Sequence, residues 1–183
     1  MIYKFYRQRI FPHLLNQVMQ TASLMDKRRE LLLPVAGEVL EIGFGTGLNL
    51  PFYQQVDTLY ALEPNPDIYR LAAQRVHEAP FDVQHIQASA EKLPFASASL
   101  DHIVSTWTLC SIASLEQALA EIFRVLKPGG ALHLVEHVLH SENRNIERAL
   151  KDAGLELAEC RYFDAEGIPK IAQRMLLARA VRP

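Results

Sequence analysis

The stretch of sequence that decides the fold is Val39-Leu40-Glu41-Ile42-Gly43-Phe44-Gly45-Thr46-Gly47. Its apolar first half predicts a buried strand, and three glycines follow it directly. Glycine has no Cβ, so a glycine loop can approach a ligand where any other residue would clash. The next apolar run ends at Glu63, where a carboxylate can accept hydrogen bonds from both hydroxyls of a ribose. The loop and this glutamate together predict a nucleoside-binding unit.

The spacing of the glycines separates the classes of nucleotide ligand. A dinucleotide-binding loop has the pattern G-x-G-x-x-G and places a pyrophosphate on a helix N-terminus. Here the pattern is G-x-G-x-G, and Leu48 stands at the third glycine position of the dinucleotide pattern. No lysine follows, which argues against a phosphate-cradling P-loop. A cofactor with a ribose but no phosphate fits this loop better, and S-adenosylmethionine is such a cofactor.

Short apolar runs alternate with helical patterns along the middle of the chain. We expect buried strands at Glu38–Ile42, Thr58–Leu62, Val83–Ala88, His102–Thr106 and Ala131–Glu136. The clearest helical pattern covers Leu115–Leu126, with Ser114 as its N-cap and Pro128-Gly129-Gly130 as its stop signal. Alternation of this kind predicts parallel strands joined by crossover helices.

The two ends of the chain complete a single predicted domain over residues 1–183. Residues 1–35 form an expected helical cover, in which Tyr3, Tyr6, Ile10 and Leu14 repeat at helical spacing. Residues 36–138 form the cofactor-binding core. Residues 139–183 supply a short helix at Asn145–Ala153 and strands at Glu156–Tyr162 and Arg174–Val181. The predicted fold is α/β and Rossmann-like: a doubly wound, seven-stranded, mostly parallel sheet with one antiparallel strand near its edge.

Composition narrows the possible partners. The 183 residues are 49% hydrophobic and carry a net charge of −2, which favours one globular domain and argues against nucleic-acid binding. Two cysteines are too few for a disulfide framework, so we expect a cytoplasmic protein; no metal site is expected either. No run reaches the ~18 apolar residues of a membrane span. The basic residues among the first 30, including Arg28, suggest weak contact with an anionic membrane or, as we favour, a solvated helix face.

Several stretches resemble the class I S-adenosylmethionine-dependent methyltransferases of the type 11 group, above all the alkyl-thiol methyltransferase-like branch. The matching stretches, in family order, are residues 39–53, 61–66, 90–95, 108–112 and 124–130 running into Glu136-His137-Val138. This resemblance implies a methyltransferase that uses S-adenosylmethionine.

The resemblance also implies roles for individual residues. Gly43, Gly45 and Gly47 would line the methionine part of the cofactor, with Glu41 beneath the loop. Glu63 would bind the ribose. The other cofactor contacts implied by the match are Thr46, Asn49, Pro64, Asn65, Ser89, Ala90, Glu91, Thr106 and Trp107. The family commonly has Asp where this chain has Ser89, which should weaken one contact with adenine.

The methyl acceptor is the least defined part of the prediction. Relatives usually have several dozen residues between the fifth strand and the next helix, whereas here about ten separate Glu136 from the expected helix, which indicates either an open site or the loss of a covering segment. We expect a small, apolar acceptor: a thiol, a phenol or quinol, or a lipid-like molecule. His137, at the end of the fifth strand, is the candidate proton acceptor, although a plain polar strand end is the simpler interpretation. Cys110 is expected to be a small buried residue.

Two alternative functions stay open at this point. The first is a non-catalytic protein that binds S-adenosylmethionine or S-adenosylhomocysteine behind an incomplete lid. The second is a nicotinamide-dependent oxidoreductase, which the glycine spacing disfavours. The oligomeric state does not follow from the sequence.

Overall fold

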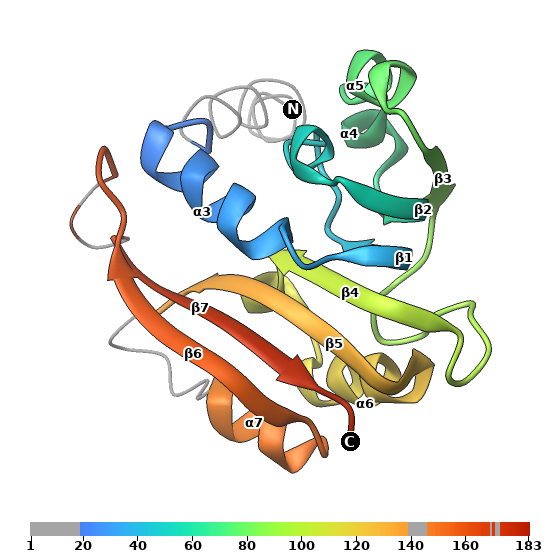
Figure 1. Cartoon of the computed structure of the whole chain (residues 1–183), viewed down its shortest axis with the longest axis vertical. Coiled ribbons are helices and arrows are strands. Elements are labelled where there is room, and N and C mark those ends of the chain that lie inside the picture. Colours follow the sequence, from blue (N-terminus) through green and yellow to red (C-terminus); the bar gives the residue numbers. More distant parts are fainter. Residues whose placement is uncertain (1–18, 139–145, 169, 171–172) are drawn as a thin grey trace, which may run out of the picture.

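The computed structural model describes residues 19–138, 146–168, 170 and 173–183 (Figure 1). The aromatic and aliphatic stripe expected from Tyr3 to Leu14 lies outside these residues. So does most of the connection between the fifth strand and the following helix.

A seven-stranded sheet forms the centre of the molecule, in the order β3-β2-β1-β4-β5-β7-β6. Its strands are β1 (Ala36–Ile42), β2 (Gln55–Leu62), β3 (Asp82–Ile86), β4 (Leu100–Thr106), β5 (Leu126–His137), β6 (Glu156–Asp164) and β7 (Arg174–Val181). The first five strands pair in parallel, and β7 runs antiparallel to both β5 and β6. The predicted doubly wound sheet with one antiparallel strand near its edge is confirmed.

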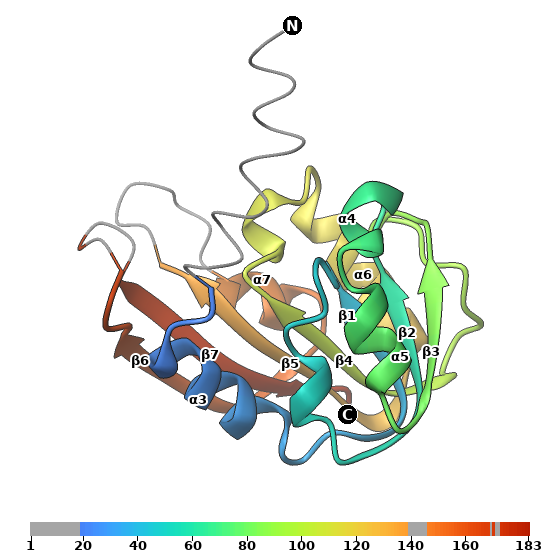
Figure 2. The same ribbon diagram turned by 90° about the horizontal axis from the view of Figure 1, so that it is seen from above.

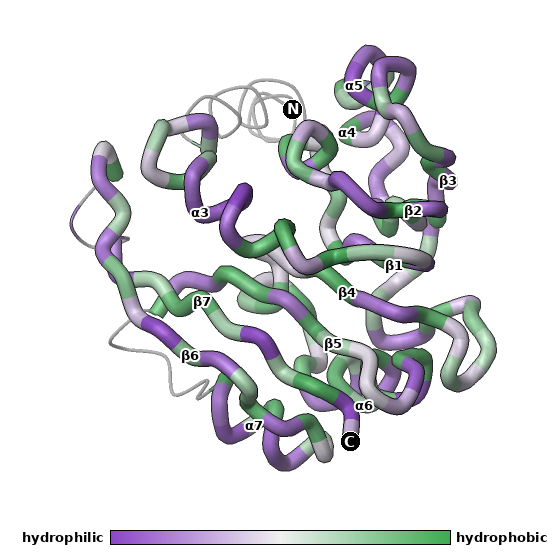
Figure 3. Tube along the Cα trace, in the orientation of Figure 1, coloured by the Kyte–Doolittle hydropathy of each residue, from purple (hydrophilic) through white to green (hydrophobic). Residues whose placement is uncertain are grey.

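Helices cover both faces of this sheet (Figures 1 and 2). One face packs against α3 (Ala22–Leu32) and against α4 (Pro66–Arg70) and α5 (Ala73–Glu78). The other face packs against α6 (Leu115–Val125) and α7 (Ile146–Asp152). Many residues of α3 are hydrophilic (Figure 3), yet Leu24, Leu31 and Leu32 are buried in the first of these two cores. The helix therefore docks on the sheet through a narrow apolar stripe.

The expected cap of α6 is present, but its expected stop is not. The Ser114 hydroxyl accepts a hydrogen bond from the Gln117 N–H at 3.4 Å, as the capping pattern predicted. The helix ends at Val125, and β5 begins at the next residue. Pro128-Gly129-Gly130 therefore lies inside the strand, where the Gly129 N–H donates to the Arg182 carbonyl and the Arg182 N–H donates to the Gly130 carbonyl. The prediction of a stop at these residues was wrong because the chain becomes extended at Leu126, two residues before Pro128.

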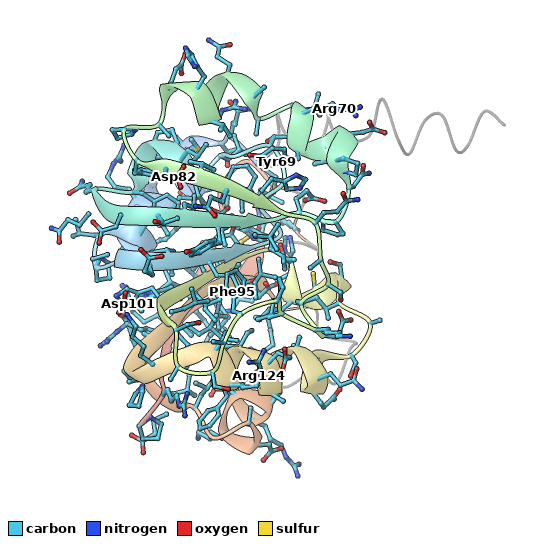
Figure 4. All side chains as sticks on the ribbon, turned by 90° about the vertical axis from the view of Figure 1, so that its right-hand side faces the viewer. Tyr69, Arg70, Asp82, Phe95, Asp101 and Arg124 are labelled. Atoms are coloured by element: carbon cyan, nitrogen blue, oxygen red, sulfur yellow. The ribbon has the colours of Figure 1, made fainter. Side chains whose placement is uncertain are left out.

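Arg124 ties the end of α6 to the loop that precedes β4 (Figure 4). Its guanidinium donates to the Phe95 carbonyl at 2.8 Å and to the Leu93 carbonyl at 3.1 Å. The same guanidinium pairs with Glu121 one turn earlier on the helix. These bonds fix the loop against the helix because one planar group satisfies several acceptors at once.

Strand register aligns the carboxyl ends of the parallel strands. Ile42 lies beside Leu62 on one side and beside Ser105 on the other. Thr106 lies beside Val135. The loops that follow β1, β2, β4 and β5 therefore emerge at one edge of the sheet, the edge at which open α/β sheets bind their ligands.

Candidate functional site

The three glycines of the loop after β1 differ in what surrounds them. All three have positive φ, which favours glycine at each position. A Cβ on Gly43 would lie 2.1 Å from the Thr108 Oγ1, and one on Gly47 would lie 3.1 Å from a Leu50 methyl group. Among the described residues, a Cβ on Gly45 would meet only a carbonyl oxygen, at 3.8 Å. Packing thus explains Gly43 and Gly47, whereas the described part of the chain leaves the Cβ position of Gly45 open.

Glu63 stands at the end of β2 and faces the loop of glycines. Its Oε2 accepts a hydrogen bond from the Gly45 N–H at 3.1 Å, and its Oε1 accepts one from the Asn65 N–H at 3.0 Å. An ionised carboxylate offers about four acceptor positions, so each oxygen can accept one more donor. Two ribose hydroxyls are donors of the required number and kind. The buried carboxylate beside the open Cβ position of Gly45 therefore fits a nucleoside cofactor.

The turn after Glu63 is held from β3 and α4. His85 Nε2 lies 2.8 Å from the Glu63 carbonyl, and its ring stacks on Tyr69 with centroids 3.8 Å apart. Gln87 donates to the Pro64 carbonyl at 3.3 Å. This role of His85 has no sequence signal, because its partner is the main-chain carbonyl of a residue 22 positions away. The side chain of Asn65, an implied cofactor contact, caps α4 by accepting a hydrogen bond from the Asp67 N–H at 3.0 Å.

A buried polar network lies beneath the glycine loop. The Glu41 carboxylate accepts hydrogen bonds from Asn49 Nδ2 at 2.9 Å and from the Tyr53 hydroxyl at 2.7 Å. Asn49 Nδ2 also donates to Thr106 Oγ1 at 3.2 Å. Glu41 is 1% exposed and Asn49 is fully buried, so these bonds replace water for both. The network links β1, the loop after it and the end of β4.

Arg28 of α3 joins this network. Its Nη1 donates to Asn49 Oδ1 at 2.6 Å and to Thr106 Oγ1 at 3.2 Å, and its guanidinium lies over the Trp107 ring at 4.6 Å. Arg28 is only 4% exposed, so the interpretation of this basic segment as a solvated helix face was wrong at this residue. Its neighbours do fit that interpretation: Lys27 pairs with Glu30, and Arg29 pairs with Asp26.

Burial shifts the pKa values of both charged groups of the network, Arg28 and Glu41. Desolvation lowers the pKa of Arg28 to about 10, although the nearby Glu41 opposes that shift. Desolvation raises the pKa of Glu41 to about 7, against the hydrogen bonds from Tyr53 and Asn49 and the charge of Arg28. Arg28 therefore stays cationic at neutral pH, while Glu41 titrates near neutrality.

Trp107 occupies a strained backbone position at the end of β4. Its φ is +55°, a conformation that bulky residues rarely adopt. The Trp107 N–H donates to the Val135 carbonyl at 2.7 Å, and the indole N–H points at the Met175 sulfur at 3.1 Å. His137 ends β5 directly opposite Met175 in the sheet register. Trp107, an implied cofactor contact, and His137, the candidate proton acceptor, are thus both next to Met175.

Glu136 directly precedes His137 in β5, so its side chain lies on the opposite face of the sheet. Its Oε1 accepts from the Thr108 and Leu109 N–H groups at 2.9 Å and 2.8 Å. These groups open the short helix η3 (Leu109–Ser111), so the carboxylate caps its N-terminus. Among the described residues, Oε2 has no hydrogen-bond partner. Desolvation raises the pKa of Glu136 to about 7 despite these main-chain donors.

The remaining predicted residues lie around the same edge of the sheet. The Thr46 carbonyl accepts from Arg75 of α5 at 2.9 Å. Ala90 is buried, and the Ser89 hydroxyl donates to Glu91. Glu91 in turn accepts from the Ser114 N–H at the start of α6, at 3.4 Å. The segment expected beside adenine is therefore anchored to the helix on the far face of the sheet.

Other candidate groups lie elsewhere or have a different environment from the one expected. Cys110 is exposed, so the expectation of a buried thiol was wrong: η3 turns it outward after the buried Leu109. Within the sheet, His102 Nδ1 lies 3.0 Å from His133 Nε2. Desolvation lowers the pKa of His133 to about 3. The described residues contain no group of three or more metal-ligating side chains. No helix within the described ranges is long and apolar enough to span a bilayer.

The fold and this site define a nucleoside-binding α/β protein, and comparison with known proteins specifies the family. Residues 40–134 match the family described as "Methyltransferase domain". Human thiol S-methyltransferase TMT1A is 33% identical over 141 residues, covering 70% of this chain and 58% of TMT1A. The UbiE ubiquinone/menaquinone C-methyltransferase of Syntrophotalea carbinolica is 31% identical over 111 residues, covering 59% of this chain and 47% of that enzyme. The chain belongs to the S-adenosylmethionine-dependent methyltransferases that carry this domain, and it spans a little over half of TMT1A.

Solved structures support the same fold. A putative methyltransferase of Bacillus halodurans superposes with a TM-score of 0.73 at 18% identity, covering 88% of this chain and all of that one. Geranyl diphosphate methyltransferase in complex with SAM superposes with a TM-score of 0.71 at 15% identity, covering 87% of this chain and 84% of that one. At these identities the likeness concerns the architecture alone.

The contrast between Gly45 and Gly43 gives a test of the loop. We expect Gly45→Val to lose binding of S-adenosylhomocysteine, because its side chain would enter the space that the described residues leave open and its φ of +59° would be strained. We expect Gly43→Ala to lower the melting temperature, because its Cβ would collide with Thr108. Calorimetric titration and thermal unfolding of both variants provide the measurements. Normal ligand binding by Gly45→Val would mean that the loop is only a structural turn.

Glu136 predicts how stability depends on pH. Because its pKa is raised to about 7 in the folded protein, the folded state keeps a proton that the unfolded state releases near pH 4.5. The free energy of unfolding therefore falls as pH rises from about 4.5 to about 7, by on the order of 3 kcal/mol for this group, and then levels off. We expect Glu136→Gln to flatten this slope, measured by urea unfolding at several pH values. An unchanged slope would contradict the assignment.

Proposed function

We propose that this chain transfers the methyl group of S-adenosylmethionine to the sulfur of a small, apolar thiol. The observation that carries the proposal is the buried Glu63 carboxylate, which has acceptor positions left for two hydroxyls, beside the open Cβ position of Gly45. Support for a thiol comes from the relatives named thiol S-methyltransferase, in human and in mouse. The predicted cofactor residues listed above are proposed to surround this cofactor.

Each part of the site has a separate proposed task. Glu63 would bind the ribose, and the loop around Gly45 would lie along the methionine part. The turn held by His85 would position the adenine side. When bound, the cofactor supplies a methyl group already activated by its positive sulfur. What the chain must add is alignment of the acceptor with that methyl group, an effect worth up to about 7–11 kcal/mol.

A thiol acceptor suits the side chains at the end of β5. Thiols ionise with a pKa near 8.5, so some thiolate is present at neutral pH without a strong base. His137 is half-buried beside Met175 and would take the proton from an acceptor that ionises less readily. His137 should therefore matter more for a phenol or quinol than for a thiol.

Quinols and lipid-like amines form the second class of candidate acceptors. A UbiE C-methyltransferase and the phosphatidylethanolamine N-methyltransferase of Cereibacter sphaeroides, 28% identical over 118 residues, are also relatives. An acceptor screen that measures released S-adenosylhomocysteine across thiols, quinols, phenols and amines decides between these classes. Turnover with thiols supports the proposal, and turnover with quinols or amines alone contradicts its acceptor.

The same screen tests the alternative functions from the sequence. Tight binding of S-adenosylhomocysteine without turnover of any acceptor would favour a non-catalytic cofactor-binding protein. Stabilisation by NAD and not by S-adenosylhomocysteine would favour an oxidoreductase, against the family to which the chain belongs.

Glu63→Ala tests the proposed ribose contact. We expect the affinity for S-adenosylhomocysteine to fall about tenfold to a hundredfold, because hydrogen bonds to a charged group contribute roughly 1.5–3 kcal/mol. Calorimetric titration measures the change. Asp57→Ala, at an exposed position on the same strand, is the matched control and should bind as the wild type does. Equal affinities for all three proteins would exclude Glu63 as the ribose ligand.

A further inference from the structure

We propose that Arg28 of α3 receives the α-carboxylate of the methyl donor, so that this helix supplies a binding residue of the cofactor site. The inference rests on the proposed function in one respect only, the identity of the cofactor. Neither the sequence patterns nor the resemblance placed Arg28 in the cofactor site.

The first observation is an unused donor on a buried cation. Arg28 Nη1 donates to Asn49 and Thr106, but its Nε is buried and has no acceptor among the described residues. A guanidinium carries five N–H donors in a fixed plane, and burial without acceptors is costly. A ligand that brings acceptors to this plane would therefore be bound strongly.

The second observation is the absence of a direct counter-ion within the described part of the chain. The acidic group nearest in the network is Glu41, whose oxygens accept from Asn49 and from Tyr53 and make no ion pair with Arg28. The side chain of Asn49 bridges the two charges: its NH₂ group donates to Glu41, and its oxygen accepts from Arg28. Arg28 thus keeps its charge without a contacting carboxylate. An anionic ligand group would complete the pair.

The third observation is the position of Arg28. It contacts Thr106 at the carboxyl end of β4 and lies over the ring of Trp107, next to the edge where the glycine loop begins. The methionine part of the donor is expected along that loop and carries a carboxylate. Planar, paired hydrogen bonds from arginine match the geometry of a carboxylate.

A carboxylate at this place could belong to the donor or to an acidic acceptor. We assign the donor because Arg28 is bonded to Asn49 and Thr106, two residues already implied in cofactor binding. An acidic acceptor is the rival source. The two sources differ in which ligand responds when Arg28 is changed.

The experiment compares ligands with and without the carboxylate on the full chain. S-adenosylhomocysteine carries it, and methylthioadenosine lacks the whole amino-acid part. We expect Arg28→Met to weaken S-adenosylhomocysteine binding about tenfold to a hundredfold and methylthioadenosine binding less than about twofold, measured by calorimetric titration. Arg28→Lys should restore part of the loss because it keeps the charge and loses the planar donors.

The matched control is Arg29→Met on the same helix, at an exposed position, which should bind both ligands as the wild type does. Equal loss of both ligands in Arg28→Met would overturn the proposal in favour of a purely structural role. Unchanged S-adenosylhomocysteine affinity, with a loss confined to acidic acceptors in the turnover assay, would overturn it in favour of the acceptor.

A further measurement needs no variant of Arg28. Decarboxylated S-adenosylmethionine should bind the wild type at least about tenfold more weakly than S-adenosylmethionine does. Equal binding would overturn the carboxylate assignment and leave the proposed function intact. A wild-type protein that binds neither methylthioadenosine nor S-adenosylhomocysteine would instead contradict the proposed function itself.

Discussion

The hydrogen bond from Asn49 to Glu41 is the interaction on which the rest of the site depends. Glu41 lies at the end of the first strand under almost complete burial, where an ionised carboxylate is costly unless donors replace the water it loses. Asn49 supplies one donor and Tyr53 the other, and both belong to the segment just after the glycine loop. The loop must therefore turn back over β1 for the carboxylate to be satisfied. A local requirement of burial thus helps to define the conformation of the loop.

Arg28 connects the helix α3 to the same hydrogen-bond network. The side-chain NH₂ of Asn49 donates to Glu41, and its side-chain oxygen accepts a hydrogen bond from the guanidinium of Arg28, 21 positions earlier in the sequence. Because Thr106 Oγ1 accepts from both Arg28 and Asn49, the ends of β1 and β4 and the helix α3 share one network. Networks of this kind hold a single arrangement when every member is satisfied. The unused Nε of Arg28 makes this one incomplete.

The strands and the pairing of the glycine loop with Glu63 could be predicted from the sequence because their signals are local: apolar runs, glycine spacing and an acidic residue at a strand end. Arg28 could not, since Lys27-Arg28-Arg29 is one run of charge, and only the tertiary positions of Asn49 and Thr106 turn the middle residue inward. The contact of His85 and the backbone conformation of Trp107 could not be predicted either. A main-chain acceptor on another strand and a left-handed φ have no periodic signature. The predicted end of α6 was wrong because a proline and two glycines also fit the irregular start of a strand.

Glu41 and Glu136 divide the support of the site between the two faces of the sheet. Each is buried, and desolvation raises the pKa of each to about 7. Their partners differ: side-chain donors and a nearby arginine surround Glu41, whereas Glu136 holds main-chain N–H groups of the loop after β4. Protonation of Glu41 would weaken its attraction to Arg28, while protonation of Glu136 would weaken the cap of η3. Acidification near neutral pH therefore affects the Glu41–Arg28 network and the loop after β4 through separate groups. The Glu136→Gln variant isolates the effect of Glu136.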